Sequence, residues 1–312
     1  MKNVFLFPGQ GAQYPGMGRD LWEKSAAVKA LFRLASGVMG RDMETLLFEG
    51  SADDLKATDK AQGAITLANL AAAAFLRERG IVPAAAAGFS LGEYAALAAA
   101  GVLGEEAVFS LVKIRGELME KASRALDTQA GRAGMMAVMG LDFPEVERAL
   151  GDAGIKDAFA ANYNSPAQTV VSGTAEALAA AEAALKAAGA RRCIRLAVSG
   201  PFHCPLLGEA REGFAAELRG CDFADPNITV YSNVTGKAIE TGEEARRLAV
   251  EQITRPVLWA AIEKNILAAG CERVLEVGPG TVLAGLWKAV CGEPPCLPAG
   301  SAEAICGLEG GA

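Results

Sequence analysis

Short runs of hydrophobic residues alternate along this chain with longer segments in which hydrophobic and polar residues recur at helical spacing. This alternation is typical of an α/β fold, in which buried strands are continuously apolar and amphipathic helices cover the sheet. It predicts strands at residues 4–7, 84–87 and 274–277, and helices at about 20–36, 61–79, 93–100, 105–126 and 282–290. The segment after Val290, which contains several Gly and Pro residues, is expected to be loosely structured.

The middle of the chain carries a second, distinct pattern. Apolar runs predict strands at residues 135–139, 159–161, 169–171 and 193–198, separated by helices at 144–150 and 176–188. The resulting β-α-β-β-α-β order matches a ferredoxin-like module. We therefore predict that residues 128–198 form a small subdomain, inserted into a larger discontinuous domain made of residues 1–127 and 199–312.

The composition excludes several classes of protein but does not identify a function. The 312 residues are 51% hydrophobic and 21% charged, which is typical of a folded chain and excludes wholesale disorder. A net charge of −7 argues against a nucleic-acid-binding protein, because phosphate contacts require an excess of Lys and Arg. With a single histidine and no clustered ligands, we expect no metal site.

Two further features bear on where the protein is found. No apolar run approaches the roughly 20 residues that a membrane-spanning helix needs, and the run Val4–Phe7 is too short for a signal peptide. The seven cysteines form no C-x-x-C pair. We therefore expect a cytoplasmic protein with reduced thiols and no membrane association.

The first candidate for chemistry is the segment Gly88–Gly92, which fits the nucleophile-elbow pattern G-x-S-x-G. A predicted strand precedes it and a predicted helix follows, and the two glycines permit the sharp turn that exposes the hydroxyl of Ser90. Backbone N–H groups at the start of that helix point toward any oxyanion formed beside Ser90. The alternative is an ordinary glycine-rich turn in which Ser90 only caps the helix.

The second candidate is His203, because a serine hydroxyl needs an adjacent base to act as a nucleophile at neutral pH. His203 is the only histidine of the chain and hence the only imidazole available. A lone histidine is more often a packing or surface residue, and this alternative weakens only because a nucleophilic Ser90 needs a partner. No acidic residue is evident as its orienting group; a backbone carbonyl or an amide side chain can fix the tautomer instead.

The third candidate is Arg115, which falls on the hydrophobic stripe of the predicted helix 105–126. A guanidinium keeps its charge and is costly to bury unpaired, so Arg115 needs a carboxylate. That carboxylate belongs either to the protein, in an internal salt bridge, or to the substrate. In the second case Arg115 selects an acyl group that carries its own terminal carboxylate. The glycine turn at residues 8–11 is either an ordinary βα turn or a source of a second oxyanion donor.

Together these stretches resemble the malonyl-CoA:acyl-carrier-protein transacylase family and the related polyketide acyltransferase domains. The resemblance runs from residue 5 to about residue 288. It rests on the stretches FPGQGAQ (7–13), GFSLGEY (88–94), VKIRG (112–116), NYNSPAQTVVSG (162–173), PFH (201–203), YSNVTG (231–236), QITRPV (252–257) and EVGPG (276–280). It implies an α/β-hydrolase-like core with an inserted ferredoxin-like subdomain.

The resemblance also implies roles for the matching residues. Ser90 is the acylated nucleophile in this interpretation, and His203 is its general base and acid. The backbone N–H groups of Gln10 and Leu91 form the oxyanion hole. Arg115 binds the malonyl carboxylate, in agreement with the interpretation of its place on the helix.

Two supporting residues and one departure complete the comparison with the family. Gln252 resembles the family's glutamine near the catalytic histidine, where a backbone carbonyl is thought to orient the imidazole. Asn162 resembles a residue of the small subdomain that lines the cleft near the pantetheine arm. Phe89 replaces the histidine that commonly precedes the nucleophile, which bears on the choice between malonyl and bulkier acyl groups.

The implied reaction is a ping-pong transfer of malonyl from malonyl-CoA to the phosphopantetheine thiol of acyl carrier protein. It supplies fatty-acid synthesis and needs no metal or redox cofactor. An acidic carrier protein calls for a basic docking patch, for which the candidates are Lys186, Arg191, Arg192 and Arg195. We expect a monomer. The alternatives are a stand-alone polyketide acyltransferase, an acyl-thioester hydrolase with the same Ser–His pair, a generic esterase and a non-catalytic scaffold.

Overall fold

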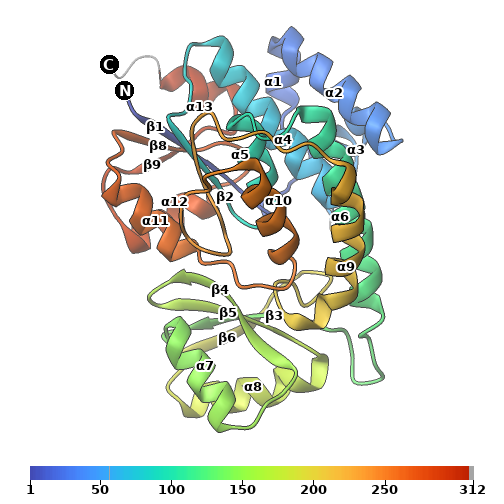
Figure 1. Cartoon of the computed structure of the whole chain (residues 1–312), viewed down its shortest axis with the longest axis vertical. Coiled ribbons are helices and arrows are strands. Elements are labelled where there is room, and N and C mark those ends of the chain that lie inside the picture. The colour runs from blue at the N-terminus through green and yellow to red at the C-terminus, as the bar shows by residue number, and fades with distance from the viewer. Residues whose placement is uncertain (56, 309–312) are drawn as a thin grey trace.

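The computed structural model describes residues 1–55 and 57–308, and its larger part is built on a five-stranded sheet (Figure 1). The strands are β1 (Asn3–Phe7), β2 (Ala85–Gly88), β7 (Thr229–Tyr231), β8 (Arg273–Glu276) and β9 (Cys296–Pro298). They lie in the order β7-β2-β1-β8-β9, and every neighbouring pair is parallel. Such a sheet is buried on both faces, and its strands β1 and β2 are accordingly almost continuously apolar.

A second sheet lies at one end of the molecule, at the bottom of Figure 1. Its antiparallel strands follow the order β4-β5-β3-β6 and are β3 (Gly134–Met139), β4 (Ala158–Ser165), β5 (Gln168–Gly173) and β6 (Arg192–Arg195). Helices α7 (Phe143–Asp152) and α8 (Ala175–Ala187) pack on this sheet. This arrangement is ferredoxin-like, so the predicted fold class is confirmed. The division of the chain at residues 128 and 198 stays a prediction.

The main sheet is covered by helices on both faces, and β1 shows how the sequence sorts its side chains. Phe5 and Phe7 belong to the larger hydrophobic cluster, whereas Val4 and Leu6 join the cluster around Trp287 on the other face. The helices and short 3-10 turns of this part are α1 (Arg19–Lys24), α2 (Ala26–Met39), α3 (Met43–Phe48), α4 (Thr58–Glu78), α5 (Gly92–Ala99), α6 (Glu105–Arg124), η1 (Pro205–Leu207), α9 (Gly208–Glu217), η2 (Leu218–Gly220), α10 (Gly242–Glu251), α11 (Trp259–Ala268), α12 (Val282–Val290) and α13 (Ala302–Gly307).

The structure corrects two predictions and adds several short elements. The single helix expected at 20–36 is split into α1 and α2, because Ser25 is extended and its side chain accepts a hydrogen bond from Val28 N–H as the cap of α2. The segment after Val290 is not loose over residues 291–308: it contributes β9 to the main sheet, and α13 follows. The rest of that prediction, at residues 309–312, lies outside the described residues. The elements α3, α9, α10, α11 and β7 were not predicted; a three-residue strand such as β7 has too few positions to show a period.

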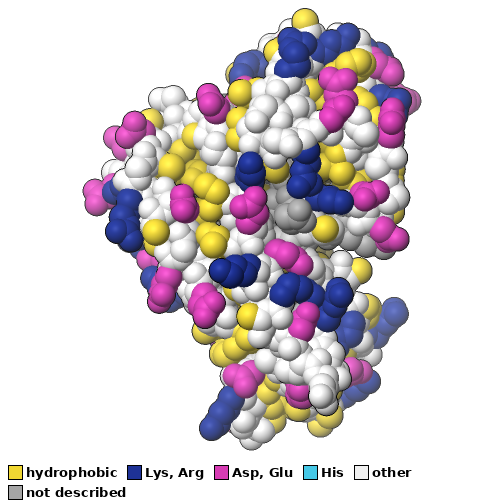
Figure 2. Space-filling view, turned by 90° about the vertical axis from the view of Figure 1, so that its right-hand side faces the viewer, with side chains coloured by type: hydrophobic (Ala, Val, Ile, Leu, Met, Phe, Trp, Pro, Cys, Tyr) yellow, Lys and Arg dark blue, Asp and Glu magenta, His cyan; other side chains and the backbone are white. Residues whose placement is uncertain are grey.

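Charged side chains of both signs are interspersed on the face of the molecule shown in Figure 2. No histidine is visible on that face, in keeping with the burial of His203, which is 2% exposed. No helix in the described part of the chain combines the length and apolar character that a membrane crossing needs.

The turn between β2 and α5 depends on two close backbone approaches. A Cβ atom on Gly88 would collide with the backbone of Gly92, and a Cβ atom on Gly92 would collide with the carbonyl of Phe7 at the end of β1. Glycine at both positions lets α5 begin directly against the ends of the two central strands. This packing fixes the direction in which Ser90 leaves the sheet.

We expect Gly92→Ala to destabilise the protein, because its methyl group must displace backbone rather than a flexible side chain. A loss of about 2 kcal/mol lowers the melting temperature by roughly 3 °C in a chain of 312 residues. Thermal unfolding followed by circular dichroism measures this change.

The matched control is Gly285→Ala in α12, where nothing lies within 4 Å of the added Cβ. Alanine is the better helix former, so the melting temperature of this variant should be unchanged or higher. Equal melting temperatures for the two variants would contradict the packing requirement at the elbow.

Candidate active site

The carboxyl ends of three neighbouring strands, β7, β2 and β1, meet at one edge of the main sheet. Residues 232–233 follow β7, residues 89–90 follow β2 and residues 8–10 follow β1. Ligands of parallel α/β sheets bind at this edge. A cavity of about 160 Å³ lies here, and the small sheet contributes Asn162 and Val170 to its walls.

The cavity brings together the residues that the sequence predicts for the site. Six of them line it, namely Gln10, Ser90, Leu91, Arg115, Asn162 and His203. The seventh, Gln252, is fully buried and contacts both His203 and Arg115. Most of the remaining wall is apolar and is formed by Phe89, Met119, Met135, Val170, Leu196, Val198, Phe202, Val282 and Leu286. The role of each of the seven residues stays a prediction.

Ser90 and His203 are in direct contact. Oγ of Ser90 lies 2.6 Å from Nε2 of His203, and Nδ1 of His203 lies 2.8 Å from the carbonyl oxygen of Gln252. Because a carbonyl oxygen only accepts, Nδ1 carries the proton and Nε2 accepts the hydrogen bond of the Ser90 hydroxyl. This is the tautomer of a general base, oriented by a backbone carbonyl. No side chain caps the start of α5, so Ser90 is not a helix cap.

Both residues have left-handed backbone conformations, with φ of 52° at Ser90 and 60° at His203. They are the only non-glycine residues with positive φ in the described chain. Such a conformation costs about 1–3 kcal/mol and persists only where the surroundings enforce it. Beside His203, the carbonyl of Phe202 accepts a hydrogen bond from Oγ of Ser172 on β5 at 2.5 Å. The small sheet therefore helps to hold the base.

Gln10 and Leu91 have backbone N–H groups with no hydrogen-bond partner among the described residues. Helix α5 begins at Gly92, so the Leu91 N–H is one of the donors that a helix start leaves unsatisfied. The turn that carries Gln10 is held by Asn69, whose Nδ2 donates to the Pro8 carbonyl at 2.9 Å. Free N–H donors beside a nucleophile are what the stabilisation of an oxyanion requires.

Arg115 on α6 is only 1% exposed and is held by amide oxygens. Its Nη1 donates to Oε1 of Gln62 at 2.9 Å, and its Nη2 donates to Oε1 of Gln252 at 3.0 Å. Its guanidinium carbon lies 5.6 Å from the ring centre of Tyr94. Among the described residues no carboxylate forms an ion pair with it, and its Nε has no partner. An internal salt bridge within the described part of the chain is thereby excluded, which leaves the charge for an anionic ligand.

Burial dominates the electrostatics of the site. Burial, and after it the positive charge of Arg115, lower the pKa of His203 to about 3, against the opposing effect of the Gln252 carbonyl. Burial also raises the pKa of Glu93 to about 8, against a backbone hydrogen bond and the charge of Arg115. Near pH 7 His203 is therefore neutral and Glu93 is mainly protonated, so Glu93 does not offset the charge of Arg115.

Gln252 follows α10 and contacts all three functional residues. Its carbonyl accepts from His203, its Oε1 accepts from Arg115, and its Nε2 donates to the carbonyl of Ser90 at 3.1 Å. One residue thereby couples the positions of the nucleophile, the base and the cation. The sequence predicted only its place near the histidine.

The functional importance of the polar residues of α4 was not predicted. Gln62, Thr66 and Asn69 are buried and are spaced by four and three residues, so they form one stripe on an otherwise apolar helix. Gln62 holds Arg115, and Asn69 holds the Pro8 turn. The sequence contained a signal, because polar residues that share one face of an Ala-rich helix are not expected in an apolar core.

Two walls of the cavity differ in character. Phe89, which stands where the family commonly has histidine, packs edge-on against Trp259, with ring centres 5.3 Å apart and an interplanar angle of 69°. On the small-sheet side, the side-chain oxygens of Asn162 and Asn164 are buried without partners. These oxygens are available as acceptors for the N–H groups of an elongated ligand.

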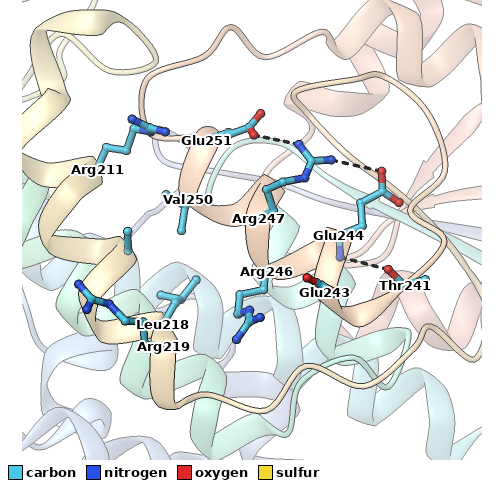
Figure 3. Close-up of a pocket in the computed structure, with 11 residues that line it drawn as sticks. Arg211, Leu218, Arg219, Thr241, Glu243, Glu244, Arg246, Arg247, Val250 and Glu251 are labelled. Atoms are coloured by element: carbon cyan, nitrogen blue, oxygen red, sulfur yellow. Dashed lines mark hydrogen bonds and ion pairs between the residues drawn. The ribbon is translucent and has the colours of Figure 1, made fainter.

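A larger cavity, of about 650 Å³, lies elsewhere, between α9 and α10 (Figure 3). Its walls carry charged side chains of both signs, and Arg247 forms ion pairs with Glu244 at 3.6 Å and with Glu251 at 2.8 Å. Its lining contains no serine–histidine pair. The chemistry therefore belongs to the smaller cavity around Ser90.

A serine at a nucleophile elbow, a neutral histidine bonded to it and free N–H donors define a class of enzymes that move acyl groups through an acyl-serine. Comparison with known proteins narrows this class. Residues 4–293 match the acyl transferase domain family, and the chain belongs to that family.

The relatives and solved structures agree with this assignment. The chain is 38% identical to the malonyl CoA-acyl carrier protein transacylase of Bacillus subtilis, over 93% of this chain and 90% of the relative. It is similar to the structure of an acyl carrier protein S-malonyltransferase from Vibrio cholerae, with a TM-score of 0.93, 35% identity and coverage of 99% and 100%. It is also similar, with a TM-score of 0.92, 35% identity and 98% coverage of each chain, to a malonyl-transacylase solved in complex with a type II polyketide synthase acyl-carrier protein. The family resemblance read from the sequence is confirmed.

Because His203 is the only histidine of the chain, its protonation can be followed directly by NMR of histidine-labelled, untagged protein. Its ring resonances should not shift between about pH 5 and 8, since burial and Arg115 place the pKa far below that range.

The control is the same protein unfolded in urea, whose imidazole should titrate near the ordinary value of about 6.5. A midpoint near that value in the folded protein would contradict a buried, neutral base.

Proposed function

We propose that this protein transfers a malonyl group from malonyl-CoA to the phosphopantetheine thiol of acyl carrier protein, as a supply for fatty-acid synthesis. The observation that carries the proposal is a guanidinium, that of Arg115, buried beside a Ser–His pair and held by amides instead of a carboxylate. A malonyl thioester provides the missing anion at the far end of the acyl group that Ser90 attacks. A neutral acyl group leaves this charge without a counter-ion.

The relatives support the same reaction. Proteins named malonyl CoA-acyl carrier protein transacylase, from Bacillus subtilis and Escherichia coli, are 38% identical to the chain over more than nine tenths of its length.

In the first half-reaction the malonyl carboxylate binds Arg115, and the thioester carbonyl carbon lies against Oγ of Ser90. Nε2 of His203 takes the hydroxyl proton while Oγ bonds to that carbon. The N–H groups of Gln10 and Leu91 donate hydrogen bonds to the carbonyl oxygen and stabilise the negative charge that develops on it. The C–S bond then breaks, the thiolate of coenzyme A takes the proton from His203, and a malonyl-Ser90 ester remains.

The second half-reaction repeats these steps with the carrier thiol. His203 takes the proton of the phosphopantetheine thiol, the sulfur attacks the ester carbonyl, and the oxygen of Ser90 leaves and recovers the proton. The apolar walls around the ester favour this thiol over water, because the phosphopantetheine arm fills the cavity and displaces solvent.

Acyl carrier protein is the second substrate, and we place its docking surface on the small sheet. Arg191, Arg192 and Arg195 are exposed, the last two on the edge strand β6. Lys186 near the end of α8 bonds to Glu182 at 2.6 Å, which leaves three arginines for an acidic partner. The enzyme acts as a monomer in this proposal, with the small subdomain at residues 128–198 carrying the partner.

Brief incubation with malonyl-CoA should add the mass of one malonyl group to the protein in intact-protein mass spectrometry. Holo acyl carrier protein should then remove it, and Ser90→Ala should form no adduct. Malonate released to water with no transfer to the carrier would identify a thioester hydrolase instead. Neither adduct nor turnover from folded protein would identify a non-catalytic scaffold.

Substitution of Arg115 tests the selection of the acyl group. Arg115→Ala should lower kcat/KM for malonyl-CoA by roughly 10²-fold or more, because it removes charge-assisted hydrogen bonds worth about 1.5–3 kcal/mol each. Acylation by acetyl-CoA should be unchanged or faster in this variant.

Arg115→Lys is the matched control, since it keeps the charge but loses the forked donor geometry. Its kcat/KM for malonyl-CoA should lie between the values for the wild-type protein and for Arg115→Ala. If the wild-type protein accepts acetyl-CoA as readily as malonyl-CoA, selection through the carboxylate is wrong.

A further inference from the structure

The loop after β7, residues 232–236, lies directly against the nucleophile elbow. The proposed mechanism gives none of its residues a role. Within it, Asn233 is fully buried. Its Oδ1 accepts the backbone N–H of Ser90 at 2.7 Å, and its Nδ2 donates to the carbonyl of Gly88 at 2.7 Å. One amide side chain therefore bridges the turn from the residue before Phe89 to the nucleophile itself.

The backbone of Asn233 is held as firmly as its side chain. Its N–H donates to Oε2 of Glu93 at 2.6 Å, and its carbonyl accepts the N–H of Leu258 at 2.8 Å. Glu93 lies in the first turn of α5, the helix that begins at the elbow. Helix α5 thus holds Asn233, and Asn233 holds the turn at Ser90. All four polar groups of Asn233 form hydrogen bonds.

These contacts bear on the two features that acylation needs. The left-handed conformation of Ser90, with φ of 52°, directs Oγ toward His203 and persists only if it is enforced. Asn233 also accepts the N–H of Ser90. Of the two successive N–H groups at the elbow, that of Ser90 is therefore paired, and that of Leu91 has no partner among the described residues.

We propose that Asn233 is a positioning residue for the nucleophile: by bridging the Ser90 N–H and the Gly88 carbonyl, it holds the turn that keeps Oγ on His203 and Leu91 N–H free for the oxyanion. The inference rests on the proposed acyl transfer. It concerns the rate of the acylation step and not substrate binding, because the hydrogen bonds that hold Arg115 come from Gln62 and Gln252 and not from Asn233. Loss of the bridge therefore lowers kcat and leaves KM for malonyl-CoA little changed.

The first test is Asn233→Ala, assayed by rapid-quench measurement of malonyl-enzyme formation. The rate is expressed per protein molecule that finally carries malonyl, so that misfolded protein does not count. We expect a fall of roughly 10²-fold, comparable to the loss of an oxyanion-hole donor.

The matched control is Asn3→Ala at the opposite end of β1. The Asn3 side chain is also buried and uses both its polar atoms, donating to the Val82 carbonyl and accepting from Arg273, each at 2.9 Å. This variant should lose stability and keep the wild-type rate per active site.

Asn233→Asp gives a signature that a purely structural role would not produce. An ionised Asp accepts from the Ser90 N–H but cannot donate to the Gly88 carbonyl, whereas a protonated Asp does both. The acylation rate of this variant, divided by the wild-type rate at the same pH, should therefore rise as the pH is lowered. This second variant also carries the test if the alanine variant does not fold.

The outcomes separate the inference from the proposed function. Wild-type protein that takes up no malonyl group overturns the proposed function, and the inference with it. Wild-type acylation combined with an unchanged rate in Asn233→Ala, or with a pH-independent ratio for Asn233→Asp, overturns the positioning role alone.

Discussion

A guanidinium buried without a carboxylate is the constraint on which this site depends. Arg115 cannot lose its charge, so the fold surrounds it with amide oxygens, from Gln62 on α4 and from Gln252 after α10. Burial lowers the pKa of His203 and keeps that base neutral, and the charge of Arg115 adds to this effect by disfavouring a second positive charge. In the proposed reaction the malonyl carboxylate offsets the charge of Arg115, which makes His203 a stronger base once that acyl group is bound. Under that proposal the charge of Arg115 contributes both to substrate selection and to base strength.

The two sheets together form the walls of the cavity around Ser90 and Arg115. The parallel sheet delivers Ser90 and Gln10 from the ends of adjacent strands, and the small sheet closes over them. Val257 joins the two sheets, because its N–H donates to Ala161 at 2.9 Å and its carbonyl accepts from Tyr163 at 2.8 Å. The segment that carries Gln252 therefore runs from the base to the edge strand β4 of the small sheet.

Much of this could be predicted from the sequence, for reasons that differ from residue to residue. The elbow is a local pattern whose glycines are required by sterics, and Arg115 is visible as a charge on an apolar helical stripe. Reasoning from the residues alone left the orienting group of His203 open; the structure supplies the Gln252 carbonyl, a contact across 49 residues. The bridge from Asn233 to Ser90 spans 143 residues and has no local signal at all.

Errors in the fold prediction have a similar origin. The cap at Ser25 splits a helix whose apolar periodicity continues across the break. The strands β7 and β9 have three residues each, so they gain their identity from pairing with β2 and β8 and not from their own pattern. The polar stripe of α4 was readable, but its meaning depends on which side chains face it.

The strand order also governs what happens while the chain is being synthesised. The two central strands of the main sheet, β1 and β2, are made first, and the strands that flank them, β7, β8 and β9, are made last. The small antiparallel sheet is contiguous in the chain and has the local contacts that let it close in between. Until the final third emerges from the ribosome, the pair that carries the serine has both edges unpaired, and open edges recruit strands of other chains. A nascent chain of this enzyme is therefore exposed to aggregation until β7 and β8 have emerged and paired with β2 and β1.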